Sequence, residues 1–220
     1  MNNLARDLSN KKKGASQRND DANIDAKLVK RFKKGDKAAF GELVERYQRK
    51  VFSIALGMVK NQEEAMDITQ DTFVKVHRYL KNFQGTSSFY TWLYRIVLHL
   101  AIDHMRKEGR RTYTEFDERI GTEQESNEKS RFLSNRSDLN PSTMVSRKEL
   151  AEKIQDAVAE LPPYHRAVII MREVEGLSYT EMATILEVSK GTVMSRLHHA
   201  RQKLRRLLAP YIEEEFTIRE

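Results

Sequence analysis

The chain has 220 residues, of which 39 are Lys or Arg and 32 are Asp or Glu, so its formal net charge is +7 at pH 7. A hydrophobic fraction of 39% argues against a fibrous or wholly disordered protein. The basic balance favours a polyanionic partner, nucleic acid before a membrane surface, although a basic protein without such a partner has the same composition. The absence of cysteine excludes disulfides, Cys-based zinc fingers and thiol catalysis, and it fits a reducing cytoplasm.

Residues 1–22 are polar, include three consecutive lysines at 11–13, and contain no apolar segment of the kind that a secretory signal needs. We expect a disordered arm, either a solvated tail or an additional contact to nucleic acid. The most apolar stretch, residues 51–59, is too short to span a membrane, so the protein is expected in the cytoplasm. Because Gly (9) and Pro (4) are scarce and no strand-like alternation occurs, the expected fold class is all-α.

The first half predicts helices over residues 25–34 and 37–60, then a third helix capped by Asn61, with Glu64 at the N3 position of an Asx capping box. Helical spacing predicts a buried stripe on this third helix, formed by Ala65, Ile68, Thr72, Phe73, Val76 and Leu80. The opposite face carries Asp67, Gln70, Asp71, Val74 and Arg78. An acidic face on a basic protein does not suit nucleic acid. It is either a solvated surface or a docking site for a protein partner.

Residues 83–107 combine a Gly-containing loop, three candidate N-caps at 86–88 and an aromatic helix. The expected buried stripe comprises Phe89, Trp92, Leu93, Ile96, Val97, Leu100 and Ala101. The side chains expected to face outward are Tyr90, Thr91, Tyr94, Arg95, Leu98, His99 and Arg106. Exposed tyrosines beside Arg are typical of single-stranded nucleic-acid binding, in which bases stack on the rings and Arg holds phosphate. Phe89 and Trp92 are better explained as core residues.

Helical periodicity stops between residues 111 and 146, where seven acidic and five basic residues occur. We expect a flexible acidic linker there, joining two small helical domains. The predicted organisation is therefore an arm at 1–22, a first domain at 23–110, the linker at 111–146, a second domain at 147–211 and a tail at 212–220.

The second domain ends in a helix-turn-helix pattern. Helices are expected at 149–159 and 164–174, separated by Leu161-Pro162-Pro163 and ended by Gly176. Ser178 and Glu181 form a capping box before a short helix that ends near residue 186, and Ser189 caps the last helix. The expected buried stripe of the last helix is Val193, Leu197, Ala200, Leu204 and Leu207.

The last helix also has a polar, basic face. Thr192, Ser195, Arg196 and His199 share this face in the N-terminal half, the part of a recognition helix that enters a major groove. Ser and Arg can bond base edges. The residues expected to contact phosphate are Arg196, Arg201, Lys203, Arg205 and Arg206. The pattern favours a DNA-binding element over an ordinary helical hairpin.

Four runs carry a resemblance to a known family: AAFGELVERYQRKVFSIA (38–55), DITQDTFVKVHRYL (67–80), FQGTSSFYTWLYRI (83–96), and the segment from LPPYHRAV to ARQKL (161–204). The chain resembles the extracytoplasmic-function (ECF, group IV) sigma factors of the bacterial sigma-70 family, most closely their envelope-stress group. The resemblance covers about residues 24–110 and 147–208, and it implies that the first domain is sigma region 2 and the second is region 4.

The resemblance implies an alternative sigma factor that binds core RNA polymerase, recognises the −10 and −35 promoter elements, melts the −10 region and directs transcription of a stress- or signal-responsive regulon. Catalysis, metals and cofactors are not implied. The linker would thread into the RNA path of the polymerase. An anti-sigma factor is a further implied partner, which can hold the protein at the inner membrane.

Three sets of residues follow from the resemblance. The set implied to dock on the β′ clamp helices is Asp67, Gln70, Asp71, Phe73, Val74 and Arg78. The set implied for −10 recognition and melting is Phe83, Gly85, Tyr90, Thr91, Trp92, Tyr94, Arg95 and His99. The set implied to read the −35 element, on a domain that also rests on the β flap, is Lys190, Thr192, Ser195, Arg196, His198, His199, Arg201 and Lys203.

The chain departs from the family pattern at four positions, which bear on the promoter sequence it reads. His99 stands where Asn is common, Met194 where Arg is frequent, and His198 and His199 where an aromatic residue and Arg are often found.

Two other functions compete with the sigma-factor interpretation. A stand-alone helix-turn-helix regulator would leave the acidic face and the FYTWLYRI segment without a role. An enzyme would have to use His99, Asp103 and His104 as a metal set, or the adjacent His198 and His199, which point about 100° apart on a helix and do not easily share a ligand face.

Overall fold

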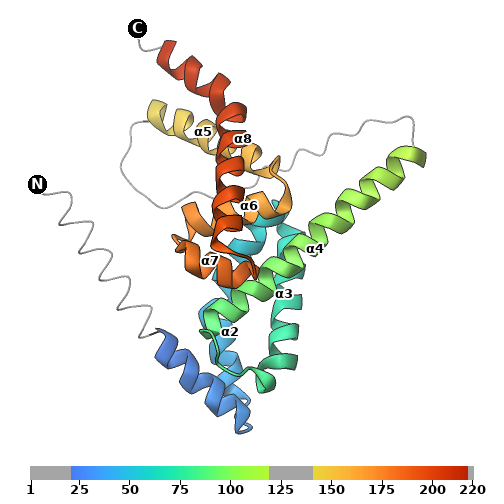
Figure 1. Ribbon diagram of the computed structural model, residues 1–220, viewed down its shortest axis with the longest axis vertical. Helices are drawn as coiled ribbons and strands as arrows, with labels where there is room; N and C mark the ends of the chain where they lie inside the picture. The colour runs from blue at the N-terminus through green and yellow to red at the C-terminus, as the bar shows by residue number, and fades with distance from the viewer. Residues whose placement is uncertain (1–20, 119–140, 218–220) are drawn as a thin grey trace, which may run out of the picture.

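The computed structural model describes residues 21–118 and 141–217, with side chains over 21–108 and 149–211. All regular structure within these residues is helical (Figure 1), which confirms the all-α class. After a helix at residues 21–33, the elements are α2 (Ala38–Val59), α3 (Gln62–Tyr79), the 3₁₀ helix η1 (Leu80–Asn82), α4 (Phe89–Glu118), α5 (Pro141–Ala159), α6 (Pro163–Ile169), the π-helical turn η2 (Ile170–Val174), α7 (Tyr179–Leu186) and α8 (Lys190–Thr217). We call residues 21–118 the first module and residues 141–217 the second module.

In the first module, α2, α3 and α4 pack against one another around the predicted apolar stripes. Asn61 caps α3 as expected, because its side chain accepts hydrogen bonds from the backbone N–H groups of Glu63 (2.8 Å) and Glu64 (3.1 Å). The carboxylate of Glu64 lies 2.9 Å from the His104 ring on α4, so this side chain ties two helices together. Ala65, Ile68, Thr72, Val76 and Leu80 are buried, and Phe73 is half-buried.

The helix at 21–33 is fixed to α2 by a buried polar cluster. The Tyr47 hydroxyl donates to Asp25, and Arg46 Nε lies 3.3 Å from the same carboxylate. Burial raises the pKa of Asp25, and the hydrogen bond from Tyr47 and the charge of Arg46 oppose that change. Residues 21–24 extend this helix beyond the expected start at 25.

The second module has the predicted helix-turn-helix. Ser178 and Glu181 form the complete capping box, and Glu187 ends α7 in the left-handed conformation at φ 54°. Ser189 Oγ accepts from the backbone N–H of Thr192 at 3.1 Å and caps α8. Val193, Leu197 and Ala200 are buried against the preceding helices, and Leu204 and Leu207 are half-buried.

The helices on either side of the expected linker are longer than the sequence pattern indicated. α4 continues to Glu118 and extends beyond the body of the molecule (Figure 1), and α5 begins at Pro141. A formed helix propagates without an apolar stripe when good helix formers follow, and Pro is favoured in a first helical turn. α8 likewise continues to Thr217, into the expected tail. The predicted arm at 1–20 and the centre of the linker, 119–140, lie outside the described residues.

The two modules share one continuous hydrophobic core. The sequence pattern had predicted two separate small cores instead. α4 packs against α6 and α7, and α2 packs against α6 and η2. Gly57 permits this approach, since a Cβ there would lie 3.2 Å from Ile170 Cδ1. The buried Arg166 of α6 donates to the carbonyl of Met58, near the end of α2, and to that of Ala159. Burial lowers the pKa of Arg166.

Candidate polymerase and nucleic-acid interfaces

The outer face of α3 is exposed, as its periodicity predicted. Asp67, Gln70, Asp71, Val74 and Arg78 are all solvent-accessible, and 56% of Val74 remains exposed, which is unusual for a large apolar side chain. The hydroxyls of Thr69 and Thr72 on this helix donate to backbone carbonyls four residues earlier and are not displayed to a partner.

An open groove of about 600 Å³ runs between α2 and α3 next to this face. It is lined by Phe40, Val44, Gln48, Thr69, Gln70, Phe73, Val74 and His77. The half-buried Phe73 and the exposed Val74 therefore belong to one apolar depression, with Asp67 and Asp71 on the same helix. An apolar groove beside carboxylates is suited to a helix that presents apolar and basic side chains.

The loop before α4 carries an aromatic cluster. The ring centroids of Phe83 and Trp92 are 5.0 Å apart, and Phe89 lies 6.0 Å from Trp92. Lys33 donates to the carbonyl of Phe83 and links this loop to the first helix. Trp92 and Phe83 are half-buried, so part of each ring is accessible.

Two small residues set the shape of this loop. Gly85 has φ +74°, a conformation that a side chain would strain. Ser88 Oγ accepts from the backbone N–H of Thr91 at 3.0 Å, which starts α4 at the position that the sequence indicated.

The second module covers the face of α4 that was expected to be exposed. Tyr94 is 0% exposed and Leu98 is 1% exposed, so the prediction that they face solvent is wrong. α6 and α7 pack over them, and burial raises the pKa of the Tyr94 phenol, with a smaller contribution from Glu175. The sequence does contain a signal for this second buried face. Residues 89–102 are apolar on nearly all sides of the helix, which is typical of a helix buried on two faces.

Polar side chains at the edge of this contact are paired across it. The Tyr90 hydroxyl donates to Glu175 at 3.0 Å, and Lys50 Nζ lies 3.2 Å from the same carboxylate and 4.5 Å from the Tyr90 ring centroid. Arg95 donates to Glu187 at 2.7 Å and to the Thr184 carbonyl at 2.8 Å. His99 is exposed further along α4.

Lys50, Glu175 and Glu187 were not predicted from the sequence as functional residues. No local pattern could have found them, because each becomes significant only through a residue of the other module.

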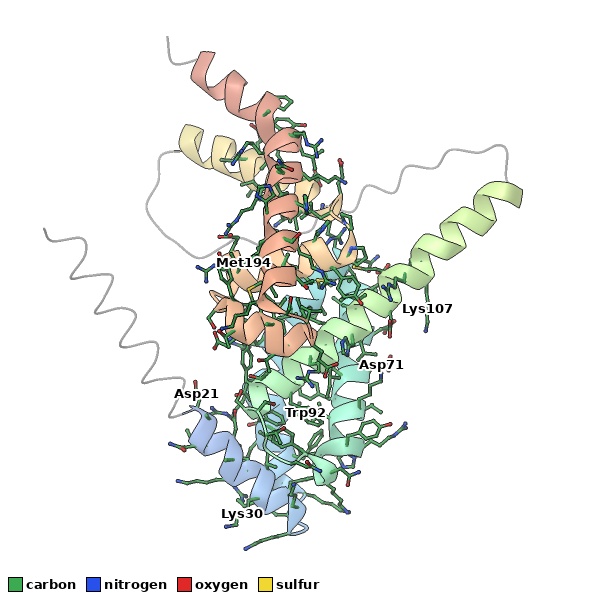
Figure 2. All side chains as sticks on the ribbon, in the orientation of Figure 1. Asp21, Lys30, Asp71, Trp92, Lys107 and Met194 are labelled. Atoms are coloured by element: carbon green, nitrogen blue, oxygen red, sulfur yellow. The ribbon has the colours of Figure 1, made fainter. Side chains whose placement is uncertain are left out.

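Five of the −35 candidates on α8 are exposed: Lys190, Ser195, His198, His199 and Arg201. Three members of the set have partners within the protein. Thr192 bonds to Ser189 through both its N–H and its hydroxyl, Arg201 pairs with Glu173 at 2.6 Å, and Lys203 Nζ donates to the Glu160 carbonyl at 2.6 Å. Figure 2 shows Met194 at the start of α8, well away from Asp71 on α3 and from Trp92 at the start of α4.

Arg196 points into the junction between the modules. Its guanidinium lies 4.5 Å from the Tyr164 ring centroid, and Arg106 of α4 lies 5.2 Å from the same ring. A groove of about 310 Å³ is found there. The pKa of the neighbouring His165 is lowered mainly by burial and further by its electrostatic interactions with His199, Arg196 and Lys203.

Among the described residues, no helix has both the length and the apolar character that crossing a membrane requires.

Two family models match the chain. Sigma-70 region 2 matches residues 43–111, which are parts of α2 and α4 with α3 between them. Sigma-70 region 4 matches residues 151–204, which include the helix-turn-helix. Together they cover more than half of the chain, in the order that the resemblance implied.

Curated relatives span both modules. The chain is 37% identical over 194 residues to the RNA polymerase sigma-H factor of Pseudomonas aeruginosa, covering 86% of this chain and 96% of that protein. It is 38% identical over 189 residues to the ECF RNA polymerase sigma-E factor of Escherichia coli K12, with the same coverage of each. Because the relatives include the first module, the alternative of a stand-alone helix-turn-helix regulator is wrong.

Solved structures are similar to most of the chain, across both modules. The structure of CnrH in complex with the cytosolic domain of CnrY aligns with a TM-score of 0.59 at 26% identity, covering 85% of this chain and 98% of CnrH. The sigma factor RpoE of Bartonella quintana, in complex with the anti-sigma factor NepR, aligns with a TM-score of 0.57 at 23% identity, covering 77% of this chain and 96% of that one. The chain therefore belongs to the sigma-70 family: it is an ECF RNA polymerase sigma factor, a non-enzymatic protein that directs promoter-specific transcription initiation.

Proposed function

We propose that the outer face of α3, together with the groove beside it, is the surface that docks on core RNA polymerase. The residues involved are Asp67, Gln70, Asp71, Phe73, Val74 and Arg78. The single observation that carries the proposal is the exposed Val74 in an apolar groove of about 600 Å³ on the same helix as two exposed carboxylates. Such a surface is costly to leave in water and unsuited to DNA, so it fits a polymerase helix with apolar and basic side chains.

The −10 element is assigned to the loop and first turns of α4. The accessible parts of Phe83 and Trp92 lie beside Gly85 and Thr91, a short distance from Tyr90, Tyr94, Arg95 and His99 on the same helix. Aromatic faces next to a guanidinium suit unpaired bases of a melted strand, because the bases stack and the cation holds phosphate. Tyr94 and Arg95 can take part only when the second module has moved away, since both contact or lie beneath it.

The −35 element is assigned to the exposed N-terminal half of α8. Lys190, Ser195, His198 and His199 are the side chains available to a major groove, and Arg201 can exchange Glu173 for a phosphate. Thr192 stays in the proposed −35 set, although it also takes part in the cap at the start of α8. Lys203, near the junction of the modules, is assigned to a phosphate. Arg196 must leave its position over Tyr164 to reach DNA.

An anti-sigma factor is proposed as the regulatory partner, in the cytoplasm or at the inner membrane. The support is the similarity to CnrH, whose structure was solved with the cytosolic domain of CnrY, over 85% of this chain. The anti-sigma factor would determine which stress activates the protein, and the promoters that the protein reads would determine its regulon.

The test is in vitro transcription with bacterial core polymerase on a pool of randomised promoters, with and without the protein. Transcripts that need the protein and share two spaced elements are the expected result. The variant D67A/Q70A should abolish core binding and transcription while retaining the fold, whereas Lys75→Ala, an exposed change on the same helix, should not. Unchanged core affinity of D67A/Q70A would overturn the docking assignment.

A further inference from the structure

We propose that Lys33, the last residue of the helix at 21–33, is a positioning residue that holds the loop assigned to the −10 element in its binding conformation. The inference rests on the proposed function of that loop. It adds a residue that belongs to none of the three binding sets. Lys33 also lies outside residues 43–111, the part of the first module that matches sigma-70 region 2.

The backbone of Phe83, at the start of the loop, is held on both sides. Its N–H donates to the carbonyl of Leu80 at 3.2 Å, at the end of η1. Its carbonyl accepts from the ammonium group of Lys33, a residue 50 positions earlier in the chain. The Phe83 ring lies 5.0 Å from Trp92 and 6.4 Å from Phe89, measured between ring centroids. Lys33 therefore fixes the peptide group that sets both the direction of the loop and the position of the Phe83 ring.

The loop has few other attachments between Phe83 and the start of α4. Within the part of the chain that the structure describes, residues 84–87 make no hydrogen bond to another helix. Gly85 is exposed, and a Cβ added there would meet nothing within 4 Å. The loop is thus held at Phe83, through Lys33, and at Ser88, which caps α4. A loop held at both ends loses less conformational freedom when it captures an unpaired base than a loop held at one end.

The helix that carries Lys33 is itself fixed at both ends. Phe32, next to Lys33, is buried, and its ring centroid lies 5.5 Å from that of His77 on α3. Near the start of the helix, the buried carboxylate of Asp25 accepts from the Tyr47 hydroxyl on α2. The ammonium group of Lys33 therefore reaches the loop from a rigid base, which is what a positioning residue requires.

An exposed lysine beside a DNA-reading loop can also act by binding a phosphate directly, and three variants separate the two roles. Lys33→Met removes the donor and keeps an unbranched stem, whereas Lys33→Arg retains an N–H donor. Lys30→Met makes the same change in net charge at an exposed position one turn earlier on the same helix. This control is needed because the loss of a positive charge alone weakens DNA binding.

Two measurements on the full chain follow the loop and its function. Trp92 is the single Trp of the protein and packs against Phe83, so acrylamide quenching of its emission in the free protein reports how tightly the loop is held. A direct phosphate contact would not change this signal in the absence of DNA. With core polymerase added, the permanganate reactivity of thymines in the −10 element reports the rate of promoter opening. The affinity for the same promoter is measured at low temperature, before the duplex opens.

We expect Lys33→Met to open promoters about fivefold more slowly than Lys30→Met, which is the scale of one hydrogen bond from a cation at an exposed position. Its Trp92 should be quenched more readily, and its affinity for the unopened promoter should equal that of Lys30→Met. Lys33→Arg should restore both the opening rate and the quenching of the wild type. Opening of Lys33→Met at the rate of Lys30→Met, or slow opening with wild-type quenching of Trp92, would overturn the proposal.

Phe83→Ala distinguishes failure of this inference from failure of the proposed function. If Phe83→Ala opens promoters as fast as the wild type, the loop does not read the −10 element and the proposed function is wrong. If Phe83→Ala opens them slowly and Lys33→Met does not, the loop assignment holds and only the role of Lys33 is wrong.

Discussion

Removing the hydroxyl group from Tyr94 and from Tyr90 should change the stability of the protein in opposite directions. Both residues lie on the same face of α4, and both substitutions delete one oxygen atom. Tyr94 is fully buried, and its hydroxyl has no hydrogen-bond partner among the described residues. The Tyr90 hydroxyl donates to Glu175 at 3.0 Å. The sign of each change in stability therefore tests whether the second module packs over this face of α4.

The magnitudes follow from the state of each hydroxyl group. Burying a hydroxyl without a partner costs about 1–3 kcal/mol, so Tyr94→Phe should stabilise the protein by about 1 kcal/mol or more. Tyr90→Phe loses a hydrogen bond to a carboxylate at the edge of the contact and should destabilise it by about 1 kcal/mol. For a chain of this length, 1 kcal/mol corresponds to a change in Tm of about 2–4 °C. The two variants should thus differ in Tm by roughly 4–8 °C.

The assay is thermal unfolding followed by calorimetry and by far-ultraviolet circular dichroism, with both variants and the wild type in one buffer. Trp92 emission provides an independent signal from the same face. If Tyr94→Phe lowers the Tm as much as Tyr90→Phe does, the Tyr94 hydroxyl has a hydrogen-bond partner, and the packing of α6 and α7 over α4 is refuted. Equal Tm values for all three proteins would show that the second module does not cover this face.

Three further predictions concern the second module. Ser178→Ala removes half of the capping box of α7 and should destabilise the module by about 1 kcal/mol in denaturant unfolding, while Thr180→Ala on the exposed side should have little effect. The folded-state pKa of His165 lies below 6.5, so the unfolded chain takes up the proton first as pH falls through 6.5, and stability is lost on acidification. His165→Gln should therefore lose less Tm than the wild type between about pH 7.5 and about pH 5.5. His199→Ala should reduce discrimination at the −35 element by about 1–3 kcal/mol in competition binding, whereas Arg205→Ala should weaken binding evenly, and identical sequence preference in both would contradict this assignment.

The local elements of this protein were predictable because their signals are local. Asn61, Ser178 and Ser189 each accept the backbone hydrogen bonds expected of a cap, and the first helix and the turn of the helix-turn-helix have the expected limits. The exposed face of α3 also follows from helical spacing, since α3 packs only on one side. The ends of α4 and α5 were missed because helix propagation into a polar segment leaves no periodic apolar signal.

The orientation of α4 was predicted only in part. Phe89, Leu93 and Val97 are buried as expected, because they face α2 and α3 within their own module. Tyr94 and Leu98 were expected in solvent, and they are buried because another module lies over them. A single helical wheel assigns one inside and one outside, so it fails for a helix with two packed faces.

The sequence by itself determined the helices, their caps, the two-module order and, through its specific motifs, the sigma-factor family. The tertiary structure alone decided which of the candidate nucleic-acid residues are accessible. Tyr90 and Arg95 are engaged by Glu175 and Glu187 of the other module, and Arg196 is engaged by Tyr164 of its own module, more than 30 positions away in every case. The reason is physical: caps and periodicity depend on residues within a few positions of one another, whereas the pairing of a charge across two modules depends on how their apolar faces meet.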